Sequence, residues 1–195
     1  MTDIPNASRA DELLRALAEQ LAAAGESYEL AVIGGSALLA LGLIDRPTRD
    51  VDVVALREAG VLTKAKPLPP GLVAAGARVA RDFGLPPDWL NAEPADLMDF
   101  GLPAGFLDRA ETRTFGQALT VHFASRVDQI HFKLYALVDQ GPGKHEQDLR
   151  AVRPTHDELV QAARWSRTHD SSDGYRQMLE EALKYLVVRD ADLGA

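Results

Sequence analysis

The sequence predicts an α/β fold of the α+β type, in which helices flank a mixed sheet and a helical C-terminal tail follows. Two observations predict this class. Strand and helix patterns alternate in the first part of the chain, whereas the last part carries helix patterns alone. The chain has 195 residues, 46% hydrophobic and 26% charged, which is typical of a globular protein with a sizeable core. We therefore expect an α/β domain over residues 1–150 and a helical extension packed on it over residues 151–195.

The N-terminal elements follow from the spacing of apolar residues. Leucines recur at helical spacing in Ser8–Ala24, where Ser8 is the expected N-cap. The apolar run Tyr28–Ile33 predicts a buried strand, and Ser36–Leu43 predicts a helix that starts directly after a glycine pair. Acidic and apolar residues alternate in Asp50–Ala55, which is the period of a strand with its acids on one face.

The rest of the chain is divided by prolines and glycines. Residues 64–109 are rich in proline, so we expect short helices and irregular connections there, with one regular helix at Gly71–Asp82. Alternating residues predict a strand over Phe115–Phe123. Three helices are expected after it: Arg126–Asp139, a helix that Thr155 and Glu158 open with a capping box, and Asp173–Leu186.

Composition excludes several classes of function. The chain has no cysteine, which excludes a disulfide scaffold, a thiolate zinc site and a cysteine nucleophile. Its formal net charge of −8 disfavours general binding of polyanions, which requires clustered Lys and Arg. Apolar stretches such as Leu30–Ala40 are too short to cross a bilayer, and the first residues lack the pattern of a secretion signal. We therefore expect a cytoplasmic protein without a membrane partner.

Gly34, Gly35 and Ser36 form the first part of a candidate site, at a strand-to-helix turn. Glycines there let a phosphate approach the backbone, and free N–H groups at the start of the helix attract anions. Ser36 adds a hydroxyl. A glycine pair in this position is more often a packing turn, so a second motif nearby in the chain is needed to support a functional interpretation.

Asp50 and Asp52 form the second part. Two positions apart on a strand, their carboxylates share a face and can hold one divalent cation. Mg²⁺ favours a few carboxylates together with substrate phosphates, and the two parts of the site supply both. Arg49 adjoins the first aspartate and is the best candidate to pair with a triphosphate. An Asp-x-Asp pair alone is more often a solvated face, so the combination carries the functional interpretation.

This combination resembles the signature of the DNA polymerase beta-like nucleotidyltransferase superfamily. In that signature a hydrophobic residue, Gly-Gly or Gly-Ser and a short helix precede Asp-hydrophobic-Asp-hydrophobic, which correspond here to residues 33–36 and 50–53. The resemblance implies a nucleotidyltransferase-type sheet, with Asp50 and Asp52 holding Mg²⁺ or Mn²⁺. It also implies that the turn holds a nucleoside triphosphate (NTP). The activity it implies is transfer of a nucleoside monophosphate to an acceptor hydroxyl.

A second resemblance extends along the chain to about Arg150. Lys133-Leu134-Tyr135-Ala136, followed by Asp148-Leu149, is similar to later motifs of the abortive-infection-toxin (AbiEii) type branch. The resemblance implies that Lys133 is catalytic and that Asp148 helps to bind the nucleotide. It also implies a toxin-like enzyme with a tRNA or small-molecule acceptor and a cognate antitoxin. A lysine at the edge of an apolar helical stripe is otherwise a surface residue whose stem packs against the protein.

The sequence departs from the superfamily at one position. Polymerase-type members carry a third carboxylate on a later strand, but the expected strand at Ala118–Phe123 has none, and Thr120 and His122 occupy its polar face. Three explanations stay open. Lys133 or His122 takes the place of the acid, the metal site is incomplete, or the protein is a nucleotidyltransferase-fold binding or regulatory module without catalysis.

Overall fold

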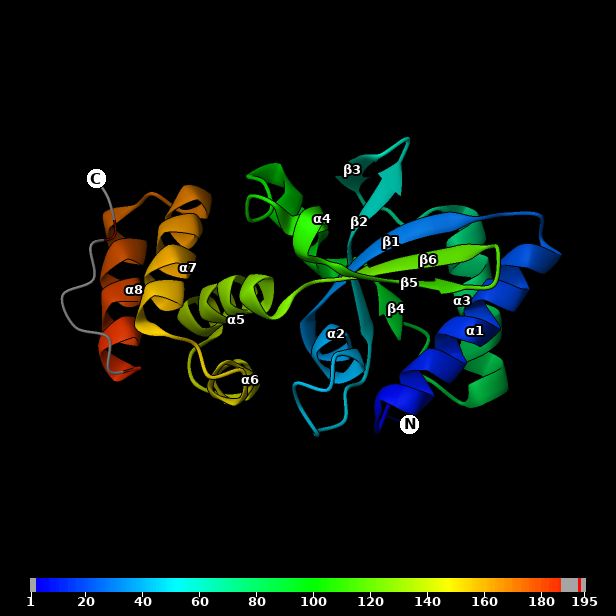
Figure 1. The fold of residues 1–195 in the computed structure, drawn as a ribbon, viewed down its shortest axis with the longest axis horizontal. Helices are drawn as coiled ribbons and strands as arrows, with labels where there is room; N and C mark the ends of the chain where they lie inside the picture. Colours follow the sequence, from blue (N-terminus) through cyan, green and yellow to red (C-terminus); the bar gives the residue numbers. More distant parts are fainter. Residues whose placement is uncertain (1–2, 187–192, 194–195) are drawn as a thin grey trace. The chain divides into compact units, whose positions relative to one another are not determined.

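The computed structural model describes residues 3–186 and residue 193 (Figure 1). It confirms the α/β fold class. The chain divides into two compact units, Met1–Ser125 and Arg126–Ala195, here called unit 1 and unit 2. This division falls before the helix at Arg126–Gln140, whereas the sequence led us to expect a boundary after Arg150. Within the described residues, no helix is long and apolar enough to span a membrane.

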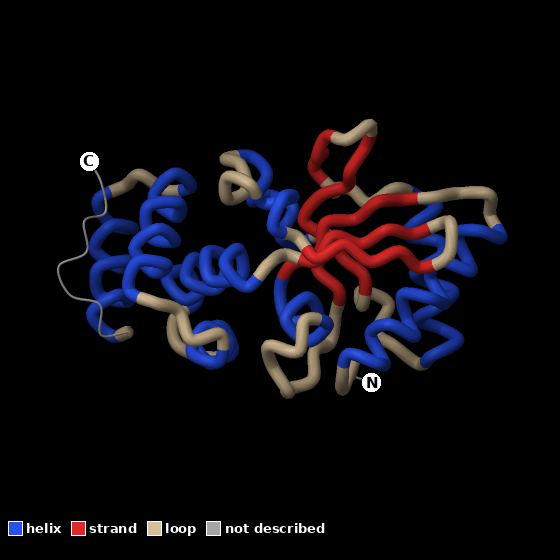
Figure 2. Tube along the Cα trace, viewed as in Figure 1, coloured by secondary structure: helices blue, strands red, loops and turns tan. Residues whose placement is uncertain are grey.

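Unit 1 is built on a sheet, whose strands are red in Figure 2. The sheet is mixed and has the order β3-β2-β1-β6-β5, with β4 paired to β2. The central strand β1 is antiparallel to β2 and parallel to β6. A bulge between Ala31 and Val32 shifts the β1–β2 register and places Asp52 opposite Ile33 at the end of β1. The strands are β1 (Tyr28–Ile33), β2 (Val51–Glu58), β3 (Val61–Lys64), β4 (Leu90–Asn91), β5 (Glu111–Phe115) and β6 (Leu119–Phe123).

Helices α1 (Ala7–Ala23) and α3 (Pro70–Phe83) lie on the same side of this sheet (Figure 1). The leucine stripe of α1 is completely buried, as its spacing predicts, and the helix packs on α3, β5 and β6. Ser8 is not its N-cap, because the Asn6 side chain accepts a hydrogen bond from the Arg9 N–H and the helix begins earlier. Helix α2 (Gly34–Ala40) likewise begins at the glycine pair and not at Ser36.

The proline-rich stretch forms short elements, as expected. The 3-10 helix η1 (Glu93–Asp99) packs on β2 and β3, and the single turn α4 (Phe106–Arg109) comes after it. Where the sequence predicted one strand over Phe115–Phe123, the structure has a hairpin of β5 and β6. The extra strand was missed because polar residues fill Glu111–Phe115, which is an edge strand with no alternating apolar residues.

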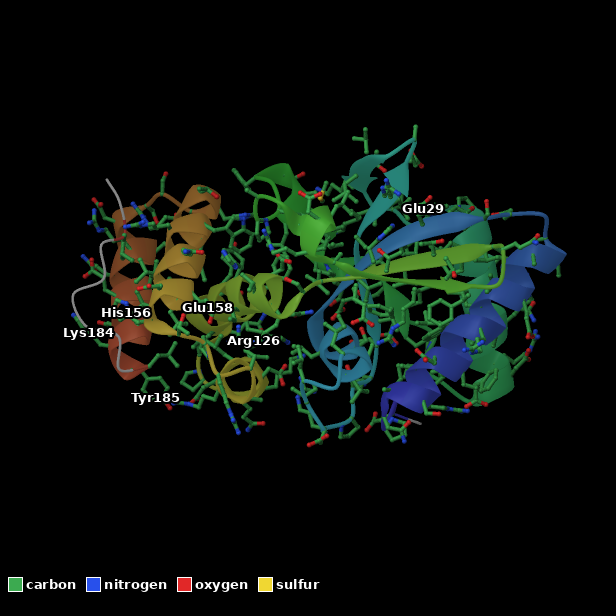
Figure 3. All side chains as sticks on the ribbon, viewed as in Figure 1. Glu29, Arg126, His156, Glu158, Lys184 and Tyr185 are labelled. Carbon is green, nitrogen blue, oxygen red and sulfur yellow. The ribbon has the colours of Figure 1, made fainter. Side chains whose placement is uncertain are left out.

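Unit 2 consists of helices α5 (Arg126–Gln140), α6 (Lys144–Ala151), α7 (His156–His169) and α8 (Asp173–Tyr185). The capping box predicted at Thr155 and Glu158 is present. Glu158 also accepts a 2.6 Å hydrogen bond from Arg126, which connects the first turn of α7 to the start of α5 (Figure 3). Arg126 is therefore the main cause of the lowered pKa of Glu158. Helix α6 was not predicted, because its sequence is strongly polar.

Candidate functional site

The β1–α2 turn brings the glycine pair against the aspartate of β2. Gly34 has a φ of +79°, a backbone conformation that residues with a Cβ rarely adopt. A Cβ built on Gly34 would overlap the Asp52 carboxylate, with Oδ2 as its nearest neighbour. Only glycine therefore fits between the end of β1 and Asp52. The turn and the carboxylate that the sequence placed in one site are in direct proximity.

Gly35 is close-packed on its other side. A Cβ there would lie 2.8 Å from Thr48 Oγ1 and 3.5 Å from Arg46 Nη2. Thr48 is buried, and its backbone pairs with Ile4 through two hydrogen bonds of 2.7 and 3.0 Å. The sequence favoured Arg49 as the cation of the site, but Arg49 is exposed and it is Arg46 that lies against the turn. A pairing between residues 4 and 48 has no local sequence signal, so Thr48 was missed.

Ser36 adds an unexplained polar atom to the turn. Its side chain is 2% exposed, and its Oγ has no hydrogen-bond partner among the described residues. A buried hydroxyl without a partner costs about 1–3 kcal/mol, so such groups are rare in folded proteins unless a ligand or water satisfies them. A ligand oxygen at the turn would supply that partner.

Both aspartates are half-buried and each accepts a hydrogen bond. Asp50 lies immediately before β2 and not within it, and its Oδ1 accepts a long bond of 3.4 Å from Thr48. Asp52 Oδ1 accepts a bond of 3.2 Å from the side chain of Asn91 on β4. Asp52 lies against the glycine turn, and Asp50 contacts Thr48, which packs on Gly35. Carboxylate oxygens are hard donors, which is the donor type that Mg²⁺ and Mn²⁺ prefer.

The donor set fits a metal that shares its coordination with substrate. Within residues 3–186 and residue 193, no group of three His, Asp or Glu side chains is arranged to hold an ion. Two carboxylates leave most of an octahedral shell to water and phosphate, which is the usual arrangement for Mg²⁺ at nucleotide sites. The residues therefore fit Mg²⁺ or Mn²⁺ bound together with a nucleotide.

His122 does not replace the third carboxylate. It lies opposite Ala31, and both ring nitrogens are engaged, at 2.8 Å from Thr112 Oγ1 and 3.2 Å from Glu29 Oε2. The hydrogen bond from Arg57, and then that from His122, lower the pKa of Glu29 (Figure 3 labels Glu29). These contacts give His122 a structural role that links β6 to β1 and β5.

Lys133 and Asp148 lie in unit 2, on α5 and α6, and form a buried ion pair. Lys133 Nζ is 2.7 Å from Asp148 Oδ2, and the side chains are 5% and 1% exposed. This burial excludes the interpretation of Lys133 as a surface lysine. The two motif residues that the sequence associated with each other are therefore direct partners.

The close approach at Gly34 gives a specific prediction. We expect Gly34→Ala to weaken binding of Mg²⁺-NTP at least tenfold, because the new methyl group displaces the Asp52 carboxylate. Gly42→Ala is the matched control, since Gly42 has a similar φ of +66° but no neighbour within 4 Å of its Cβ position. The strain of a Cβ in the left-handed region should reduce the stability of both variants by about 1–2 kcal/mol in thermal unfolding. Equal nucleotide affinity in both variants, measured by calorimetric titration, would contradict the assignment.

Comparison with known proteins identifies the family of the chain. Residues 12–151 match the model of a family described as nucleotidyltransferase of unknown function (DUF6036). The match covers the turn and aspartates of unit 1, and α5 and α6 of unit 2. No curated protein and no solved structure matches the chain significantly. The family description names no superfamily, branch or substrate. The chain thus belongs to this family of nucleotidyltransferases of unknown function.

Proposed function

We propose that the protein is a Mg²⁺-dependent nucleotidyltransferase that moves a nucleoside monophosphate from an NTP to an acceptor hydroxyl. The observation that carries the proposal is the register of β1 and β2. In this register Asp52 lies opposite Ile33 and against Gly34. A carboxylate that can bind a cation is thus adjacent to a turn that can bind phosphate. The family assignment supports general nucleotidyl transfer.

Asp50 and Asp52 hold the cation in this proposal. When bound there, Mg²⁺ would supply stabilisation of the negative charge that develops on the phosphates during transfer. Gly34 and Gly35 let the triphosphate approach the backbone, and the buried Ser36 hydroxyl hydrogen-bonds a phosphate oxygen. Arg46, which lies against Gly35, joins Arg49 as a cation available to the phosphates.

The reaction is a substitution at the α-phosphorus. The acceptor oxygen forms a bond to the α-phosphorus while the bond between that atom and the oxygen of the β-phosphate breaks. Pyrophosphate leaves with the electron pair, and the proton of the acceptor hydroxyl passes to water. The AbiEii-type resemblance implies that Lys133 is catalytic and that Asp148 helps to bind the nucleotide, and within unit 2 the two side chains form a buried ion pair.

The preferred acceptor is inferred from charge. A net charge of −8 opposes the long contact with phosphates that a folded RNA offers, so a small-molecule hydroxyl is the favoured acceptor and tRNA the second. A toxin-like role with a cognate antitoxin, as the AbiEii-type resemblance implies, would appear as growth arrest on expression. Asp52→Asn would relieve that arrest.

One observation favours a second function, that of a nucleotide-binding or regulatory module without catalysis. The described residues offer two carboxylates at the proposed site, and no third acid completes a metal cluster. Such a module would bind Mg²⁺-NTP at the same turn but release no pyrophosphate.

Transfer of label tests both proposals. The full chain is incubated with Mg²⁺, each α-³²P-labelled NTP in turn, and either a tRNA pool or a small-molecule extract. The leading proposal predicts a labelled product and pyrophosphate, both abolished by EDTA. Nucleotide binding without any labelled product would support the regulatory module. Absence of both would contradict the two proposals together.

A further inference from the structure

Strand β4 is only two residues long, yet it places one side chain directly beside Asp52. It pairs with β2 in parallel, with Val51 opposite Leu90 and Asp52 opposite Asn91. Neighbouring strands are about 4.8 Å apart, so residues in register on adjacent strands are natural contacts. The superfamily pattern places a third carboxylate on the later strand, but residues 118–123 contain none. In the structure, the side chain beside Asp52 is the amide of Asn91.

The orientation of the Asn91 amide is fixed by its second hydrogen bond. The backbone N–H of Glu93 can only donate, and it lies 2.9 Å from Asn91 Oδ1. The amide oxygen therefore faces Glu93, and the NH₂ group faces Asp52, where Nδ2 lies 3.2 Å from Oδ1. Asn91 consequently acts as a donor toward the carboxylate and does not compete with it for a cation.

The residues that precede Asn91 are fixed by contacts with α3 and β2. The nearby Trp89 is completely buried, and its Nε1 donates a 2.9 Å hydrogen bond to the carbonyl of Gly76 on α3. The backbone N–H of Val51 donates to the carbonyl of Trp89 at 2.5 Å. Leu90 packs against Gly76, where a Cβ would lie 3.4 Å from its Cδ2. The core of unit 1 thus fixes β4, and the amide needs no rearrangement to reach Asp52.

We infer that Asn91 is a positioning residue for the metal site. It holds Oδ1 of Asp52 so that the other oxygen, Oδ2, faces the Gly34 turn, where the nucleotide binds in the proposed function on which this inference rests. Hydrogen-bond partners of metal-binding carboxylates typically contribute 10- to 100-fold to metal affinity. Because the Asn91 amide is neutral, the two aspartates alone supply negative charge to the site. In this inference the cation therefore binds weakly until the phosphates of the nucleotide add their own negative charge.

Titration of the full chain with Mn²⁺, followed by electron paramagnetic resonance, tests this role without requiring activity. In the presence of a non-hydrolysable NTP, we expect Asn91→Ala to weaken Mn²⁺ binding about tenfold. Asp88→Ala, an exposed position in the same segment, should bind Mn²⁺ like the wild-type chain. An Asn91→Ala variant with wild-type affinity would overturn the positioning role. If Asp52→Asn also kept wild-type affinity, the proposed function itself would fail.

Asn91→Asp separates a role in the site from a purely structural one. The new carboxylate can keep the bond from Glu93 N–H, but it repels Asp52 unless a cation lies between them. We therefore expect a lower melting temperature than wild type without metal, and a larger rise on adding Mn²⁺. The melting temperatures of Asn91→Asp and the wild-type chain also test the positioning role if Asn91→Ala fails to fold. A rise no larger than that of the wild-type chain would overturn the inference.

Discussion

The Asp52→Asn variant is expected to transfer nucleotidyl groups about 10³-fold more slowly than the wild-type chain. A metal ion contributes several kcal/mol of charge stabilisation, and each 1.36 kcal/mol corresponds to about a factor of ten in rate. Asparagine has the shape of aspartate, so the packing against Gly34 is kept while the negative charge is lost. The rate of pyrophosphate release at saturating NTP measures the effect.

The matched control is Asp45→Asn, which removes an exposed carboxylate from the same connection between α2 and β2. Its rate should lie within about twofold of wild type, because an exposed charge outside the site has little effect at moderate salt. Melting temperatures of both variants should match that of the wild-type chain within a few degrees. A rate for Asp52→Asn equal to that of Asp45→Asn would mean that the metal does not bind at Asp52.

Asp148→Ala is expected to reduce the free energy of unfolding of unit 2 by about 3–5 kcal/mol, because removal of one partner leaves a buried charge without its counterion. Lys133 would be that charge, on a side chain 5% exposed and 2.7 Å from the lost carboxylate. Urea unfolding followed by far-ultraviolet circular dichroism measures the change. In Glu180→Ala, which breaks the exposed Arg176–Glu180 pair on α8, the change should stay below about 0.5 kcal/mol.

A double substitution separates the structural role of this pair from its proposed catalytic role. Lys133→Met with Asp148→Leu replaces a buried ion pair by apolar side chains of similar size, which is often neutral or stabilising. We expect stability to return to about the wild-type level while nucleotidyl transfer stays low. A stable double variant with wild-type activity would show that the pair serves folding alone and would contradict the catalytic role that the AbiEii-type resemblance implies for Lys133.

The elements with strong local signals were predictable from the sequence. The leucine stripe of α1, the apolar run of β1 and the capping box of α7 each encode their structure within a few residues. Elements that depend on distant partners were missed. Strand β4 is two residues long and exists only because β2 lies beside it, and edge strand β5 has a polar sequence that only its pairing with β6 makes a strand.

The residues of the candidate site likewise comprise some that local motifs predicted and others that depend on distant parts of the chain. Gly34 and Asp52 were predicted together because a turn motif and an Asp-x-Asp motif lie close in the sequence, and the structure places them in proximity. Asn91 was missed because it reaches Asp52 through the pairing of β4 with β2, and Thr48 was missed because its burial accompanies a pairing with the remote Ile4. Arg49 was preferred to Arg46 because it adjoins Asp50 in the sequence. Adjacency in the sequence does not determine which side chain lies against Gly35, and in the structure it is that of Arg46.

A crystal structure of the full chain grown with Mn²⁺ and a non-hydrolysable NTP would test the central claim most directly. We predict an anomalous difference peak within about 2.0–2.2 Å of carboxylate oxygens of Asp50 and Asp52, which is the range for small hard cations with oxygen ligands. The triphosphate should contact the backbone of Gly34 and Gly35 and the Ser36 hydroxyl. An ordered nucleotide and cation bound elsewhere, with the two aspartates in contact with neither, would contradict the account.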